Sequence, residues 1–554
     1  MPFRFRPLAL TMVTFLAGFG SAHAQTIGLI TNPGGAWDGY TLFSPQANTG
    51  VYLIDNDGML LHEWSSAPAG NLAYLQDNGD ILMAVDASNP VFTVPGAHGI
   101  VRRLDWDSNV LWEFDYSDST HCQHHDIEPL PNGNLLVLAF ELKDQAECLA
   151  AGRNPALLPD GQLFPEHIIE VQPVGADSGA IVWEWHVWDH LVQDFDSTKA
   201  NYGVVADHPE LINLNYGPSG QDWNHANSIA YNADLDQIVM SVNAFNEWWI
   251  IDHSTTTAEA AGHTGGLRGK GGDVLYRWGN PEAYDRGTPA DRHDYRQHNV
   301  HWIPDGLPGA GNILFFNNGN GRPVALPYSS AEEVITTADS LGNYPDPPTG
   351  QPHDPDTAAV ILTSIPPDSL YSRNTSSAQR LPNGNTLMCE GTEGTFWELD
   401  PSGNLMWKYV NPVNGSGPMV QNTLPSGNAV FRTFRYPTDH PAFDGRDLTP
   451  QGVLELPPVA ADLTVDEPLF VLRQAFPNPF SPYTTIPFAM RAAAPVRLEV
   501  FDVRGRRVAS LVDERMPSGS HSVTWAPGRL PAGVYQIRLQ SDGLTATRQV
   551  VHLR

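Results

Sequence analysis

Cysteine, lysine and long apolar segments are all scarce in this chain of 554 residues. Three cysteines are too few for a disulfide framework to supply most of the stability. Cys122 and Cys148 flank one expected turn and could pair, whereas Cys389 lies in an apolar strand, where we expect a free buried thiol. Beyond the N-terminus no apolar run approaches the roughly 20 residues of a membrane helix. We therefore expect a mature chain without a transmembrane segment.

Positive charge is also scarce. Lysine occurs only at positions 143, 199, 270 and 408, and the formal net charge is −31. Binding to nucleic acid or to an anionic membrane depends on clustered cationic side chains. The composition therefore argues against both kinds of partner.

The N-terminus has the pattern of a secretory signal peptide. Arg4 and Arg6 precede an apolar stretch over residues 8–19, and small residues follow at Ala22 and Ala24. We expect cleavage after residue 24 and export of the mature chain.

A short hairpin pattern recurs along the chain, in which a turn rich in Asn, Asp and Gly separates two apolar runs. Such turns tolerate the positive φ of a tight connection between twisted strands. The clear copies span residues 75–82, 130–136, 381–387 and 424–430, and looser copies begin at Tyr231 and Ile303. A second hairpin signal follows most copies, so each unit predicts a four-stranded sheet. Six such units over residues 25–454 predict an all-β fold, a six-bladed β-propeller.

Three histidines lie five or six residues before these turns: His125, His225 and His298. Equivalent positions of successive blades face equivalent places around the central channel of a propeller. We therefore expect the three imidazoles to converge there. Each of them taken alone is equally compatible with an ordinary polar residue at the start of a strand.

A metal site is an alternative role for histidines in this region. His121, His124 and His125 are close in sequence, and His293 and His298 could join them. Neither their spacing nor the nearby carboxylates match a standard zinc site. We therefore expect no metal and no other cofactor.

The composition changes after the sixth unit. Residues 455–469 are rich in Pro, Ala and acidic residues and predict a linker. Residues 470–554 contain short alternating strands typical of a small immunoglobulin-like β-sandwich. Three segments, at 476–486, 503–508 and 530–535, closely resemble the C-terminal sorting domain of the type IX (Por) secretion system. That resemblance implies an address recognised by the secretion machinery, export through the periplasm, and a final location outside the cell or on its surface. It says nothing about catalysis.

The propeller region resembles the bacterial arylsulfotransferases, which use aryl sulfates and no nucleotide sulfate donor. The matching segments lie at residues 125–127, 222–228, 297–299, 317–322 and 376–379. The resemblance implies a site in the channel, a histidine that becomes transiently sulfated, and His and Arg side chains that hold the sulfuryl oxygens. It places His125, His225, His298 and Arg322 at the site, with an aryl sulfate and a phenol as substrates.

These residue types suit sulfuryl transfer. A neutral imidazole can attack sulfur, and Arg322 with a protonated imidazole can hold the oxygens by charge-assisted hydrogen bonds. A further imidazole can exchange a proton with the phenolic oxygen. Residues 371–377 depart from the pattern, because the blade around them has no histidine at the register position. The sequence leaves open which histidine is the nucleophile, and it leaves open a noncatalytic surface propeller that binds a sulfated or other anionic ligand.

Overall fold

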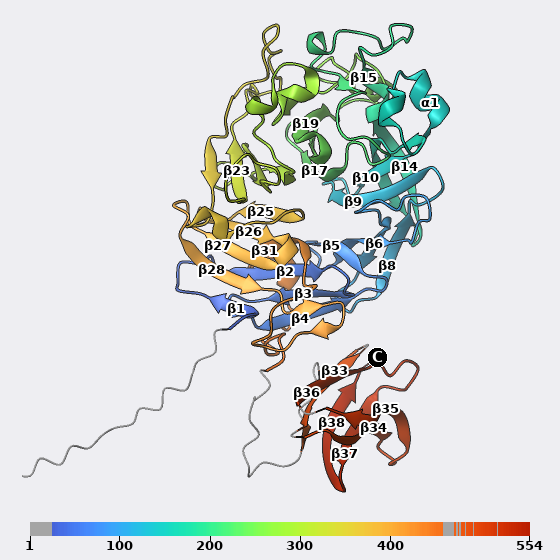
Figure 1. Ribbon diagram of the computed structural model, residues 1–554, viewed down its shortest axis with the longest axis vertical. Helices are drawn as coiled ribbons and strands as arrows, with labels where there is room; N and C mark the ends of the chain where they lie inside the picture. Colours follow the sequence, from blue (N-terminus) through green and yellow to red (C-terminus); the bar gives the residue numbers. More distant parts are fainter. Residues whose placement is uncertain are drawn as a thin grey trace, which may run out of the picture.

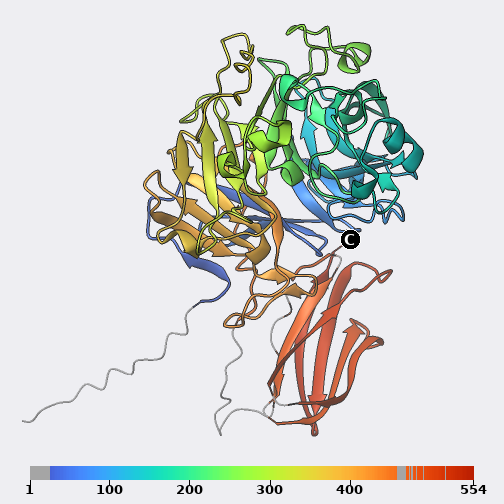
Figure 2. The same cartoon turned by 45° about the horizontal axis from the view of Figure 1, so that its top comes forward.

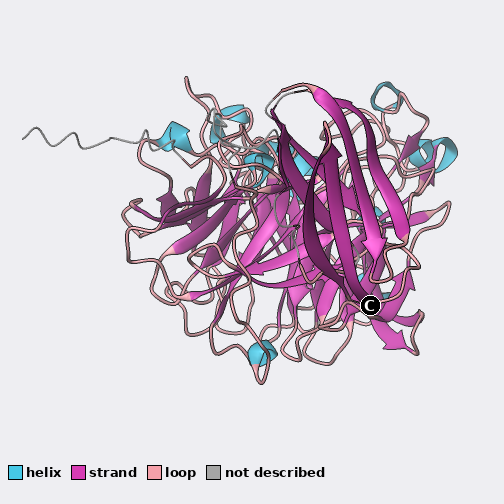
Figure 3. Cartoon of the chain, turned by 90° about the horizontal axis from the view of Figure 1, so that it is seen from below, coloured by secondary structure: helices cyan, strands magenta, loops and turns pink. Residues whose placement is uncertain are grey.

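The computed structural model describes residues 25–457, 470–472, 475, 478–481, 483–490, 492–517 and 519–553. The expected signal peptide at 1–24 and most of the linker at 455–469 lie outside these residues. Strands dominate the described part of the chain, as Figure 3 shows. No helix there is long and apolar enough to cross a membrane.

Six antiparallel sheets surround a central channel and form the blades of a propeller (Figure 1). The second, third and fourth sheets contain these strands: β5 (Gly70–Leu75), β6 (Ile81–Asp86), β7 (Gly99–Leu104) and β8 (Val110–Asp115); β9 (His121–Pro129), β10 (Leu135–Glu141), β13 (Glu166–Val174) and β14 (Ser178–His186); β17 (Ala226–Asn232), β18 (Gln237–Val242), β19 (Glu247–Asp252) and β20 (Tyr276–Trp278). The fifth contains β21 (His298–Trp302), β22 (Ile313–Asn317), β23 (Ser330–Val334) and β24 (Val360–Leu362).

The ring closes through both ends of the propeller region. The first sheet combines the late strand β31 (Val430–Pro437) with β2 (Gly39–Pro45), β3 (Gly50–Ile54) and β4 (Leu60–Ser65). The sixth sheet adds the early strand β1 (Gly28–Thr31) to β25 (Ser376–Arg380), β26 (Thr386–Glu390), β27 (Thr395–Leu399) and β28 (Leu405–Val410). Each closing strand makes ladder hydrogen bonds with a blade from the other end of the chain.

The expected Asn- and Gly-rich turns connect the first two strands of five blades, those that begin at Leu75, Leu130, Tyr231, Ile303 and Leu381. The copy at residues 424–430 is an exception. It forms the loop that leads into β31, because the inner strand of the first blade pairs with β2 at the other end of the chain. The prediction of a hairpin there is wrong.

Large side chains fill the space between the sheets. Trp64, Trp185, Trp249 and Trp407 are each fully buried. Besides 3₁₀ turns, the connections between the blade strands contain these short elements: β11 (Lys143–Asp144), α1 (Gln145–Ala150), β12 (Gln162–Leu163), β15 (Leu191–Val192), β16 (Ile212–Asn213), α2 (Thr257–Ala260), β29 (Val413–Asn414) and β30 (Gly417–Pro418).

All three cysteines of the chain lie in the described part and are free and buried. The pairing considered for Cys122 and Cys148 is not present. Cys122 packs with Phe92, Phe140 and Phe164, whereas Cys148 belongs to a different apolar cluster between the third and fourth blades. Position on either side of one turn did not bring the two sulfur atoms together.

The C-terminal strands form a body of their own, a β-sandwich of two sheets (Figure 2). One sheet contains β32 (Phe470–Leu472), β33 (Thr484–Met490) and β36 (Gly519–Trp525); the other contains β35 (Arg507–Met516), β34 (Ala494–Asp502), β37 (Gly533–Ser541) and β38 (Leu544–His552). Phe488, Leu498, Trp525 and Ile537 pack in its separate apolar core.

Candidate functional site

A cavity of about 640 Å³ opens at the end of the channel where the inner strands begin. Sixteen described residues line it, namely Gln46, Asn71, Pro95, Gly96, His98, His125, His225, Asn243, Arg296, His298, Asn320, Arg373, Asn374, Thr375, Thr392 and Phe431. None of these lining residues is Asp or Glu, although the chain carries 62 acidic residues against 31 Lys and Arg. Two arginines, with no carboxylate beside them, make this cavity suitable for an anion.

Three side chains reach the cavity from residues whose backbone has the same unusual conformation, a positive φ. His125, His225 and Thr375 have φ values of 48°, 47° and 52°. These values lie in the left-handed region, which residues other than Gly and Asn rarely adopt. β9 and β17 also change register next to their histidines. A bulge of this kind redirects a side chain at the cost of regular pairing, and such features cluster at functional sites.

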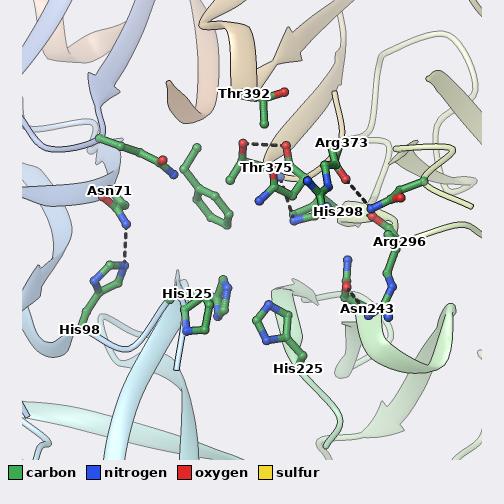
Figure 4. A pocket seen from close by; sticks show the side chains of 16 residues that line it. Asn71, His98, His125, His225, Asn243, Arg296, His298, Arg373, Thr375 and Thr392 are labelled. Carbon is green, nitrogen blue, oxygen red and sulfur yellow. Dashed lines mark hydrogen bonds between the residues drawn. The ribbon is translucent and has the colours of Figure 1, made fainter. Parts of the chain in front are cut away.

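The structure brings together the three histidines expected in the channel. The rings of His125 and His225 lie edge to face with centroids 4.8 Å apart, and Figure 4 shows them side by side. Both His125 and His298 also contact the ring of Phe431, with centroids 5.9 and 6.2 Å away.

His225 has a carboxylate partner. Its Nδ1–H donates to both oxygens of Asp222, at 2.8 and 3.0 Å, so in the neutral ring the lone pair is on Nε2. Burial lowers the pKa of His225, but the hydrogen bond and negative charge of Asp222 outweigh burial and raise the pKa above its usual value. The result is a basic imidazole in a fixed tautomer.

His125 ends a buried chain of hydrogen bonds. Its Nδ1 lies 2.9 Å from Nδ1 of His124, and Nε2 of His124 lies 2.6 Å from Oε2 of Glu166. Burial raises the pKa of Glu166 well above its usual range and lowers the pKa values of His124 and His125 well below theirs. Burial therefore favours the form with a neutral Glu166 carboxyl group and two neutral imidazoles.

Only one tautomer satisfies that neutral form. The Glu166 hydroxyl donates to Nε2 of His124, the Nδ1–H of His124 donates to Nδ1 of His125, and the remaining proton of His125 is on Nε2. If that Nε2 proton leaves, both hydrogen bonds reverse and Glu166 becomes a carboxylate. The chain can thus carry a proton between His125 and Glu166 without forming a buried imidazolium ion.

His298 joins two blades. Its Nδ1–H donates to Oδ1 of Asn318 at 2.7 Å, and its Nε2 accepts from the backbone N–H of Thr375 at 3.2 Å. The amide of Asn318 is fixed because its Nδ2 donates to the carbonyl of Ser372. Burial lowers the pKa of His298 to about 3, so the ring stays neutral. Both ring nitrogens of His298 therefore have hydrogen-bond partners, and the bond to the Thr375 backbone holds that part of the cavity wall in place.

The structure does not place Arg322 among the residues that line the cavity. Its guanidinium pairs with Glu332 at 3.1 Å and lies over the ring of Tyr328. Glu332 also accepts a hydrogen bond from Asn317, next to the Asn318 that orients His298. Arg322 is thus connected to the cavity wall through Glu332 and this loop.

The arginines at the cavity are Arg296 and Arg373, which the sequence analysis missed. Each stands two residues before a channel residue, His298 or Thr375, and this shared offset is the signal that could have found them. Arg296 donates from Nη1 to Oδ1 of Asn243 at 3.2 Å and keeps its other donors available. Arg373 is exposed at the cavity wall, where its carbonyl accepts from Asn320.

The histidines considered as metal ligands do not assemble. His121 packs against Tyr116 and His167, and His293 stacks on Trp278. Within the described residues, the one group of three potential ligands is a different set, composed of His190, His263 and Asp273.

Comparison with known proteins identifies both parts of the chain. A family model described as Arylsulfotransferase (ASST) matches residues 38–337, and one described as Secretion system C-terminal sorting domain (Por) matches residues 474–552. The sorting domain directs the protein to the cell surface or outside the cell. No curated protein shows significant sequence similarity to the chain.

Similarity to solved structures is remote. A protein of unknown function from Bacteroides caccae is 10% identical, covering 72% of this chain and 99% of its own, with a TM-score of 0.40. The periplasmic gluconolactonase of Pseudomonas aeruginosa is 12% identical, covering 68% and 97%, with a TM-score of 0.32. A virginiamycin B lyase from Staphylococcus aureus is 11% identical, covering 70% and 89%, with a TM-score of 0.28. These scores carry no inference about function.

Proposed function

The chain belongs to the arylsulfotransferase family, and we propose that it transfers a sulfuryl group from an aryl sulfate to a phenol through a sulfated histidine, without a nucleotide sulfate donor. The observation that carries this proposal is the charge of the cavity. A cavity lined by Arg296 and Arg373 and by no carboxylate attracts a sulfate ester within an otherwise acidic protein. Its location next to three imidazoles supplies the groups that the transfer needs.

We propose His225 as the nucleophile. Asp222 holds the proton on Nδ1, which leaves the Nε2 lone pair free to attack sulfur. The new N–S bond forms as the bond between sulfur and the phenolic oxygen breaks. Charge spreads over the sulfuryl oxygens in this in-line transfer, and Arg296 and Arg373 stabilise that charge.

His125 handles the proton of the phenol. In the neutral form of its chain, His125 carries a proton on Nε2 and gives it to the departing phenolate, and Glu166 becomes the carboxylate. The acceptor phenol later returns a proton to His125 as its oxygen attacks sulfur and the N–S bond breaks. The protein therefore ends the cycle in its starting protonation state.

A second candidate function is a noncatalytic surface protein that binds sulfated ligands. Thr375 favours it, because this residue occupies in the sixth blade the left-handed position that a histidine occupies in the third and fourth. Such a protein needs the cationic cavity and does not need the Asp222–His225 pair.

One assay separates the two functions. The purified chain is mixed with p-nitrophenyl sulfate and phenol, and the absorbance of nitrophenolate is followed. A transferase releases nitrophenolate at a rate that depends on phenol and forms phenyl sulfate in equal amount. Saturable binding of the sulfate ester without turnover supports the binding protein and contradicts our proposal.

For the domain organisation, we propose a signal peptide at 1–24, a propeller over 25–454, a linker at 455–469 and a sorting domain at 470–554. The separate apolar core of the C-terminal strands supports this division. Contact with the type IX secretion machinery is then the task of residues 470–554 alone.

A further inference from the structure

His190, His263 and Asp273 form a cluster on the outer side of the fourth blade, outside the channel cavity. His190 follows the 3₁₀ turn Val187–Asp189, His263 follows α2 (Thr257–Ala260), and Asp273 precedes β20. We call these three residues the His190 cluster. It joins the connection that follows β14 to the connection between β19 and β20. The proposed sulfuryl transfer uses none of its members.

The three side chains converge on one point. Oδ1 of Asp273 lies 2.9 Å from Nδ1 of His190 and 2.8 Å from Nδ1 of His263. All three ligand atoms lie within 4.8 Å of one another. Three donors around a divalent ion with bonds of about 2 Å lie on the order of 3 Å apart, so the cluster already has nearly the required dimensions.

The hydrogen bonds of His190 require a cation at this point. Its Nε2 lies 2.8 Å from the carbonyl oxygen of Ala260, which can only accept, so Nε2 carries a proton. In a neutral ring Nδ1 then holds a lone pair, and this lone pair faces the carboxylate of Asp273. Two acceptors at 2.9 Å repel each other unless a proton or a metal ion lies between them.

The surrounding residues hold His190 rigidly for such a role. Its ring stacks on Trp185 with centroids 5.6 Å apart. Gly272 passes so close that a Cβ atom there would lie 1.9 Å from the carbonyl oxygen of Ala260 and 2.6 Å from Nε2 of His190. A histidine whose second nitrogen donates to a backbone carbonyl is the usual supporting arrangement of a metal ligand.

We propose that the His190 cluster binds one divalent zinc ion. Two imidazole nitrogens and one carboxylate oxygen suit a borderline ion such as Zn²⁺ and disfavour Ca²⁺ and Mg²⁺, which prefer oxygen. His190 and Asp273 are nearly buried, with 0% and 8% of their side chains exposed, whereas His263 is 61% exposed. Water completes the coordination on the exposed side. The ion ties the connection after β14 to the loop after α2.

The exposed histidine provides a test that does not disturb folding. We would treat the full chain with a chelator, titrate it with zinc sulfate, dialyse it against metal-free buffer and measure retained zinc by atomic emission. Wild type is expected to retain one equivalent, and its Tm is expected to rise with zinc. His263→Ala is expected to retain less than a tenth of an equivalent at the same zinc concentration and to show no rise in Tm.

The matched control is His208→Ala, which removes another partly exposed histidine from the surface near this cluster. This variant is expected to retain zinc like wild type. Cobalt replacement adds a spectroscopic check, since d–d absorption bands of the bound ion should be present in wild type and lost in His263→Ala. Equal zinc retention by wild type and His263→Ala, or no retained zinc in wild type, would mean that a proton alone joins His190 to Asp273, and the proposal would be wrong.

Discussion

The two ends of the propeller channel have the same walls and differ in their acidic residues. The inner strands begin at the cavity that holds His225 and end at a second cavity of about 480 Å³. Glu128, Asp234 and Asp305 line the second cavity, along with Trp302 and Phe434, whereas no acidic residue lines the first. One short strand, β21, reaches both cavities: His298 at its start lines the first cavity, and Trp302 at its end lines the second.

A buried ion pair lies beside the second cavity, which Arg432 and Tyr74 line. Arg432 pairs with Asp126 at 2.9 Å and donates to the hydroxyl of Tyr74 and the carbonyl of Asn227. Asp126 in turn accepts from the backbone of Ile229 in the next blade. This comparison shows that the fold leaves a channel whose chemistry is set by the residues at each end.

The largest expected difference is in the loss of kcat/KM when one histidine is replaced at each end of the channel. His225→Gln should lower kcat/KM for aryl sulfate by at least about 10³-fold, because it removes the nucleophile. His301→Gln, at the second cavity, should remain within about threefold of wild type. Rates with p-nitrophenyl sulfate and phenol measure both. Equal losses in the two variants would show that both act through folding.

The next largest difference is expected in the loss of kcat/KM when one arginine is replaced at each end. Arg296→Ala should lower kcat/KM by about 10²-fold, since it removes a donor to the sulfuryl oxygens. Arg380→Ala at the second cavity, where Arg380 pairs with Glu333, should change the rate little. If Arg322→Ala had a larger effect than Arg296→Ala, the loop around Asn318 would matter more than direct charge at the cavity.

A smaller effect is expected from the carboxylate behind His225. The nucleophile must be neutral, so activity should rise with pH through the pKa of His225, which Asp222 raises. Asp222→Asn keeps an acceptor for Nδ1–H but removes the charge, so the pKa falls. The acidic limb of the kcat/KM profile should therefore move to lower pH, and the plateau should fall on the order of tenfold because the imidazole is less basic. An unmoved acidic limb would assign the titration to another group.

The smallest effect on catalysis is expected from deleting residues 470–554, which line neither end of the channel. The Tyr52 hydroxyl, which hydrogen-bonds to Tyr483, also lies 3.4 Å from Oδ1 of Asn48 and keeps that partner. The truncated protein should keep wild-type turnover and a cooperative unfolding transition while losing surface delivery. Aggregation of the truncated protein would show that the sandwich stabilises the propeller.

Most of the fold was predictable, because the sequence of a tight turn determines the backbone geometry of that turn. Turns such as Leu130-Pro-Asn-Gly-Asn favour a hairpin by local geometry alone, so five inner hairpins were predictable, and their repetition predicted six blades. The exception at residues 424–430 depends on which strand pairs with β2, and pairing across nearly the whole chain leaves no local pattern.

The site was predictable only in part. Counting residues back from the turns found His125, His225 and His298, because the channel fixes where the start of each inner strand lies. The groups that tune these imidazoles come from elsewhere: Glu166 is 42 residues from His124, and Asn318 is 20 from His298. Arg322 lies in a segment that resembles the family, but its pairing with Glu332 is a tertiary contact that spacing does not reveal.

The account depends most on the sulfated form of His225. The purified protein would be mixed with p-nitrophenyl sulfate without an acceptor, quenched in alkali within one turnover, digested and analysed by mass spectrometry. We predict a sulfuryl group on the peptide that contains His225, its loss when phenol is added before the quench, and its absence in His225→Gln. A sulfuryl group on another residue, or turnover with no modified peptide at any time, would contradict the account.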